Sequence, residues 1–62
     1  MTLQDMVIAL IDTGLSQASI AQACHTSQPV VWRASKGIDI RYSTGKEIER
    51  FYKNVMRARK AA

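Results

Sequence analysis

Residues 16–35 read SQASIAQACHTSQPVVWRAS, and apolar residues recur with helical spacing on both sides of residues 24–26. Ser16 precedes the first stretch and is a favourable N-cap. Pro29 fits only the first turn of a helix, so a second helix has to begin close to Ser27. The pattern therefore predicts two short helices that are joined by a turn of only a few residues.

Two helices joined so closely cross at a steep angle, and the crossing needs a small residue where they meet. Ala21 is placed to be that residue, and Gly37 is placed to end the second helix. The side chains expected to hold the pair together are Ile20, Ala21, Cys24, Val31 and Ala34. Such a pair is a helix-turn-helix arrangement, whose second helix can enter the major groove of DNA.

A further helix is predicted before this pair, over residues 3–12. Thr2 and Asp5 have the spacing of a capping box, and Gly14 suits the left-handed position after a helix. The apolar residues of this segment follow the helical repeat: Leu3, Met6, Val7, Leu10 and Ile11. One face of this helix is therefore expected to join the core.

After the pair, residues 38–42 alternate but have no partner strand, so an extended connector is predicted, with Ile38 or Ile40 against the core. Ser43 or Thr44 is expected to cap a last helix over residues 44–60. Its apolar stripe consists of Ile48, Phe51, Tyr52, Val55 and Met56. The sequence thus predicts one all-α domain over residues 1–62, a four-helix bundle that contains a helix-turn-helix.

The charge is divided unevenly along the chain. Residues 1–32 contain two acidic residues and no Lys or Arg, a net charge of −2, whereas residues 33–62 contain nine basic and three acidic residues, a net charge of +6. A chain with all its cations in one half is suited to bind a polyanion. The alternative is a helical interaction module that binds an acidic protein or a membrane surface through the basic helix 44–60.

Other classes of protein are disfavoured by what the sequence contains. A single cysteine excludes an internal disulfide and suits a reducing cytoplasm, and Cys24 is expected to be a small buried apolar residue. His25 and Cys24 alone are too few ligands for a structural zinc site. No spacing typical of a catalytic site or of a phosphate-binding glycine loop occurs, so we expect neither catalysis nor a cofactor, and no membrane span.

Residues 17–37 resemble the helix-turn-helix of the lambda-repressor and Cro-like regulators of phages and bacteria. The residues that carry the resemblance are Gln17, Ala21, Val31 and Gly37. His25 occupies the turn position where the family normally has glycine, and Pro29 and Trp32 are unusual in the second helix. The resemblance implies a reduced, Cro-sized domain and a phage or prophage origin.

The resemblance also implies a small transcriptional repressor that acts on double-stranded DNA in the cytoplasm, at the bacterial nucleoid or in a phage-infected host, with helix 28–36 in the major groove. Base contacts are then expected from Gln28, Pro29, Val30 and Arg33. Backbone contacts are expected from Ser16, Gln17, Ser27, Trp32, Lys36, Arg41, Ser43, Thr44 and Lys46. For Trp32 a second interpretation remains open, in which the indole covers the seam with the last helix.

The chain is expected to bind its operator as a pair, because one recognition helix reads too few base pairs for good discrimination. The contact between the two copies comes either from the apolar stripe of the last helix or from residues 38–42 pairing edge to edge. Repression, activation and a role as an accessory DNA-binding factor remain open alternatives.

Overall fold

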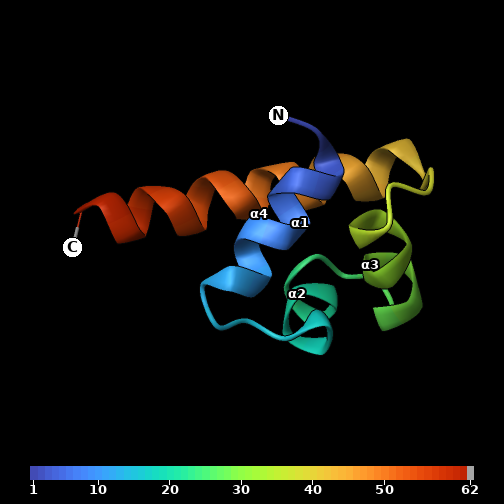
Figure 1. Ribbon diagram of the computed structural model, residues 1–62, viewed down its shortest axis with the longest axis horizontal. Coiled ribbons are helices and arrows are strands. Elements are labelled where there is room, and N and C mark those ends of the chain that lie inside the picture. Colours follow the sequence, from blue (N-terminus) through green and yellow to red (C-terminus); the bar gives the residue numbers. More distant parts are fainter. Residues whose placement is uncertain (62) are drawn as a thin grey trace.

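The helices lie close to where the sequence predicts them. The structure is a computed structural model that describes residues 1–61, and over this range it is all-helical, without strands. In chain order the helices are α1 (Leu3–Asp12), α2 (Gln17–Ala23), α3 (Gln28–Ser35) and α4 (Tyr42–Ala61) (Figure 1). The prediction of an all-α fold with four helices is confirmed for the described residues.

The ends of α1 follow from its sequence. The Thr2 hydroxyl accepts a hydrogen bond from the backbone N–H of Asp5 at 3.1 Å, and the Asp5 carboxylate accepts one from the Thr2 N–H at 3.1 Å. Hydrogen bonding of the carboxylate to Thr2, chiefly to its backbone N–H, holds the pKa of the Asp5 carboxyl below its usual value. Gly14 has φ +104°, in the left-handed region that a residue after the C-cap requires. The predicted capping box and stop signal are therefore both present.

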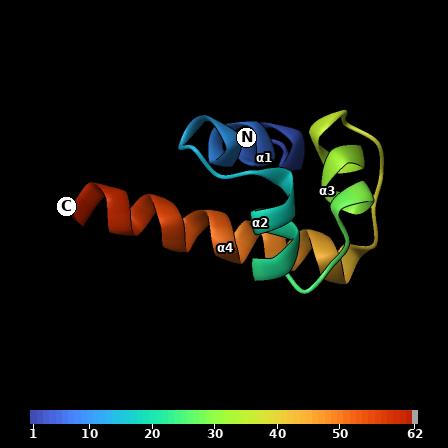
Figure 2. The ribbon, with the colours of Figure 1, turned by 90° about the horizontal axis from the view of Figure 1, so that it is seen from below.

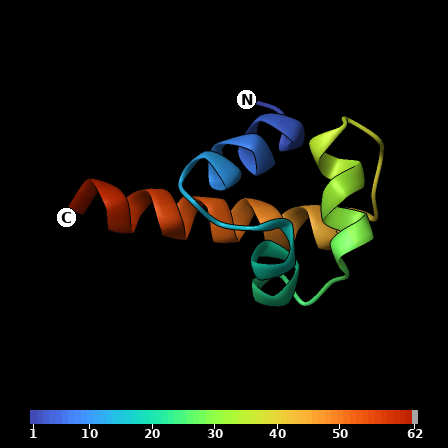
Figure 3. The same ribbon diagram turned by 60° about the horizontal axis from the view of Figure 1, so that its bottom comes forward.

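Helix α1 lies in the middle of the packing, because it contacts both α3 and α4, while α2 packs on α3. Helix α4 is the longest element and runs along the long dimension of the molecule, which measures 32 Å (Figure 2). Its C-terminal turns extend past the other helices in all three views, and α3 lies at the opposite end (Figure 3). The fold thus places α3 at one end of the molecule and the C-terminus of α4 at the other.

One cluster of buried apolar side chains joins the four helices. Its members are Val7, Leu10, Ile20, Ala21, Cys24, Val31, Ala34 and Ile48. Partly buried apolar residues pack around it: Leu3, Ile11, Leu15, Ile40, Phe51, Tyr52 and Val55. The predicted inner faces of α1, α2 and α3 are therefore largely correct, and no polar residue is buried within the described chain.

Cys24 belongs to this cluster and behaves as the sequence predicts. Only 2% of its surface is exposed, and burial raises the pKa of its thiol. The side chain is therefore a neutral, small apolar group in the core.

The start of α4 differs from the prediction of a helix over residues 44–60 capped by Ser43 or Thr44. The helix begins at Tyr42, and the N–H of Gly45 donates to the carbonyl of Arg41 at 2.9 Å, so Arg41 is the N-cap residue. Ile40, two residues before the helix, packs against the core. Ile38 remains 49% exposed, so of the two predicted anchors only Ile40 joins the core.

Candidate nucleic-acid interface

The chain reverses direction between α2 and α3 within residues 24–27. His25 has φ +56°, and the N–H of Thr26 donates to the carbonyl of Ala21 at 2.9 Å. This is a Schellman-type end of a helix, with His25 in the left-handed position. Helix α3 ends in the same way, because Gly37 has φ +79° and the N–H of Ile38 donates to the carbonyl of Arg33 at 3.0 Å. His25 thus has a left-handed backbone conformation at the turn position where the resembling family normally has glycine.

Because His25 is exposed and occupies a conformation that favours glycine, His25→Gly is expected to stabilise the protein. A left-handed residue with a side chain costs roughly 1–2 kcal/mol, of which the greater flexibility of glycine in the unfolded chain cancels a part. The expected gain is about 0.5–1 kcal/mol in the free energy of unfolding, measured by urea denaturation. As the matched control, Gly37→Ala should destabilise, since its Cβ would lie 3.2 Å from the Gln4 side chain in a strained backbone. A lower stability of His25→Gly would show that the imidazole contributes contacts of its own.

The first residues of α2 and α3 are hydrogen-bonded to each other. The Gln28 side-chain amide donates from Nε2 to Oε1 of Gln17 at 3.0 Å. Gln28 is exposed, while Gln17 is partly buried. The fold therefore brings together a predicted base contact and a predicted backbone contact, and it fixes the amide of Gln28 at the exposed start of α3.

The two serine caps beside these glutamines differ. The Ser16 hydroxyl accepts from the N–H of Ser19 at 3.0 Å and donates to the Ser19 hydroxyl at 2.9 Å, so it is already engaged in its own helix. Ser27 makes no side-chain capping bond, although it occupies the N-cap position of α3. At the first turn of α3, Pro29 has no N–H and the N–H of Val30 donates to the carbonyl of Ser27 at 3.1 Å, which leaves the Gln28 N–H and the Ser27 hydroxyl to meet an anion. Of the two serines, Ser27 is therefore the better candidate for a phosphate contact.

The outward face of α3 carries most of the predicted contacts. Within the helix only Val31 and Ala34 are buried; Val30 is partly buried. The exposed residues of the segment are Gln28, Pro29, Trp32, Arg33 and Lys36. Lys36 is the C-cap rather than the last helical residue, since α3 ends at Ser35 instead of the predicted 36. These exposed side chains leave α3 free to meet a ligand along its length.

Trp32 is 46% exposed, so it is not enclosed in a seam between helices. The Lys36 ammonium lies 5.9 Å from the centre of the indole ring. A cation at this distance from an aromatic face is favourable, and it holds a positive charge beside the exposed ring.

The predicted contacts at the start of α4 separate into two groups. Lys46 pairs with Glu49 at 4.0 Å, and its ammonium lies 5.8 Å from the ring centre of Tyr42. Arg41 is exposed and, like Arg33 of α3, forms no ion pair among the described residues. Arg41 is therefore better placed than Lys46 to offer its charge to an anion.

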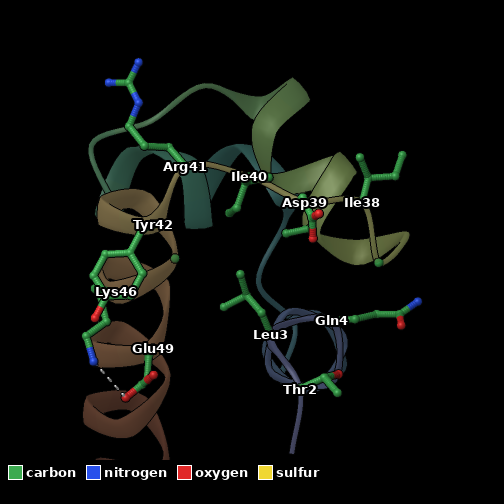
Figure 4. Close-up of a pocket in the computed structure, with 13 residues that line it drawn as sticks. Thr2, Leu3, Gln4, Ile38, Asp39, Ile40, Arg41, Tyr42, Lys46 and Glu49 are labelled. Atoms are coloured by element: carbon green, nitrogen blue, oxygen red, sulfur yellow. Dashed lines mark ion pairs between the residues drawn. The ribbon is translucent and has the colours of Figure 1, made fainter.

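Two hollows flank the connector between α3 and α4. The first has a volume of about 460 Å³ and lies between α1, the connector and the start of α4; Leu3 and Ile40 point into it, and the Arg41 guanidinium points away (Figure 4). The second, of about 400 Å³, is lined by His25, Thr26, Val30, Arg33, Ile40, Arg41 and Thr44. Sequence reasoning missed this second hollow, because its residues come from the turn, from α3 and from α4, and only the fold brings them together.

Comparison of the chain with protein-family models, with curated proteins and with solved structures finds no match. The described residues contain no helix that is long and apolar enough to span a membrane. They also contain no group of three or more potential metal ligands. The candidate site therefore rests on the geometry of α2, its turn and α3.

Proposed function

We propose that the chain is a sequence-specific double-stranded DNA-binding protein, in which α2 and α3 form a helix-turn-helix within a four-helix, lambda-repressor-like domain. In this proposal it acts as a small transcriptional regulator of the Cro type. The observation that carries the proposal is the 3.0 Å hydrogen bond between Gln17 and Gln28. This bond joins the starts of α2 and α3 across a tight turn and holds the Gln28 amide on the exposed face of α3.

The dimensions of α3 support this proposal. A helix with its side chains is about 10–12 Å wide, and the major groove is about 12 Å wide. Helix α3 uses only two residues for the core, so its remaining sides can face the groove. Gln28 can bond adenine through N6 and N7, and Arg33 can bond guanine through O6 and N7. Pro29 and Val30 offer apolar surface to a thymine methyl group.

Backbone contacts in this proposal come from both sides of α3. The Ser27 hydroxyl and the Gln28 N–H face one phosphate, and the cations Lys36 and Arg41 face others. Contacts of this kind fix the register of the protein on the duplex without reading the sequence. The Gln17 side chain acts mainly through Gln28, because its Oε1 already accepts the bond from Nε2 of Gln28.

The rival proposal, binding of an acidic partner or membrane through α4, has less support. Three cations of this helix are paired with its own glutamates: Lys46 with Glu49, Arg50 with Glu47, and Lys53 with Glu49. Exposed pairs of this kind contribute little stability, but they neutralise the middle of the helix. The cations of α3 and the connector, Arg33, Lys36 and Arg41, form no ion pair among the described residues and favour a polyanion at that end of the molecule, although Arg57, Arg59 and Lys60 near the end of α4 are unpaired as well.

Gln28→Ala is expected to weaken binding to the preferred duplex by about 1–3 kcal/mol and to change binding to random duplex little. The reason is that the amide reads a base edge and does not neutralise a phosphate. Fluorescence anisotropy with both duplexes at one salt concentration measures the two affinities. Gln22→Ala removes another exposed glutamine side chain and should leave both unchanged. An equal loss on both duplexes would mean that Gln28 only positions the protein.

The bond from Gln28 to Gln17 adds a second comparison to the same measurement. If Gln17 acts by orienting Gln28, then Gln17→Ala reduces the difference in affinity between the preferred and the random duplex. Adding Gln17→Ala to Gln28→Ala then has little further effect on that difference. Additive losses of discrimination would indicate that the two side chains contact the duplex independently.

A further inference from the structure

The second hollow, which we call the arginine hollow, lies where the turn after α2, the middle of α3 and the start of α4 meet. Its lining consists of His25, Thr26, Val30, Arg33, Ile40, Arg41 and Thr44. Five of these seven side chains are polar or cationic, and none of the seven is acidic. The volume, about 400 Å³, is within the range of small-molecule sites.

The arginine hollow is lined by two cations that have no acidic partner among the described residues. Arg33 and Arg41 come from different elements, and neither forms an ion pair with an acidic residue in the part of the chain that the structure describes. Two like charges that the fold brings to one hollow repel each other, and an anion between them would remove that repulsion. Folding thus creates a positive hollow with no internal counterion.

Other groups of the arginine hollow add hydrogen-bond donors. Thr26 and Thr44 supply hydroxyl groups. The first intrahelical bond of α4 is donated by Gly45, so the N–H of Thr44, which lines the hollow, has no partner within the helix. The Arg41 guanidinium points away from the neighbouring hollow (Figure 4). Hydroxyl groups and guanidinium groups are the donors that phosphate oxygens accept from in proteins.

We propose that the arginine hollow binds a small, multiply charged phosphate compound of the di- or triphosphate class, with Arg33 and Arg41 as its two cationic contacts. A volume of about 400 Å³ is larger than a single phosphate group fills, which favours a chain of phosphates over inorganic phosphate. Because Arg33 and Arg41 are also DNA contacts in the proposed function, such a compound competes with the duplex. That consequence, unlike the binding itself, rests on the proposed function.

Isothermal titration of the full chain with inorganic triphosphate, at constant ionic strength set by chloride, tests the proposal. The wild type should bind one equivalent, and the double variant Arg33→Ala/Arg41→Ala should bind at least about tenfold more weakly. The matched control is Arg57→Ala/Arg59→Ala, which removes the same charge at the far end of α4 and should change the affinity by less than about twofold. Circular dichroism establishes that each variant is folded.

Equal losses in the two double variants, or no saturable binding of triphosphate by the folded wild type, would overturn the proposal. Addition of a labelled duplex to the same samples tests DNA binding independently of triphosphate binding. If triphosphate binds and no duplex binds, the arginine hollow is a phosphate site and the DNA-binding proposal fails. If duplex binds and triphosphate neither binds nor displaces it, the hollow serves only the DNA backbone and the present proposal fails.

Discussion

Ile48→Ala is expected to destabilise the protein by about 2–5 kcal/mol, the cost of removing three carbons from a closed core and leaving a cavity. Ile48 is 0% exposed, and it is the only fully enclosed side chain that α4 contributes among the described residues. A domain of 62 residues has about 3–9 kcal/mol of total stability. The expected loss is therefore comparable with the total free energy of unfolding, and a large fraction of the molecules should be unfolded.

Thermal unfolding followed by circular dichroism measures this effect. Met56→Ala is the matched control, because Met56 lies on the same helix, is only partly buried and is not among the residues packed on the core. Its expected cost is below about 1 kcal/mol. If Ile48→Ala melted as Met56→Ala does, α4 would not be anchored where the structure places it.

Ala21→Leu is expected to destabilise the fold by at least about 1–3 kcal/mol, because it overpacks the contact between α2 and α3. Ala21 is 4% exposed, and its carbonyl accepts the N–H of Thr26, so the backbone cannot move away without breaking the turn. Loss of this turn would also separate Gln17 from Gln28. The variant should therefore lose duplex binding together with stability.

The control for this substitution is Ala23→Leu, which adds the same side chain to an exposed position of α2. It should melt within about 0.5 kcal/mol of the wild type. A stable, duplex-binding Ala21→Leu protein would rule out a close crossing of α2 and α3 at this residue.

Much of the fold could be predicted because several local signals agree. The capping pair Thr2 and Asp5, the position of Pro29 and the left-handed Gly37 each fix a helix end through short-range chemistry. The start of α4 could not be predicted in the same way, since Ser43 and Thr44 are both plausible caps in the sequence. There the partly buried Ile40 packs against the core just before the helix, a tertiary contact that the candidate caps do not reveal.

The candidate site likewise has some features that the sequence predicts and others that only the structure reveals. The exposure of Gln28, Arg33 and their neighbours follows from helical periodicity, so it could be predicted. The bond from Gln28 to Gln17 joins residues eleven positions apart on two helices, and spacing alone does not reveal it. The arginine hollow requires the packing of three elements, and for that reason it is visible only in the structure.

Selection of binding sites from a pool of random duplexes is the sharpest test of sequence-specific recognition of DNA by this protein. The wild type should enrich one short site, and two copies of it should occur as an inverted repeat about 10 base pairs apart or a multiple of that distance. The double variant Gln28→Ala/Arg33→Ala, selected in parallel, should enrich a different site or none, while Gln22→Ala should enrich the wild-type site. The opposite result is a wild-type pool that stays random through successive rounds while the folded protein binds DNA no better than other polyanions. That result would show that the protein does not recognise a DNA sequence.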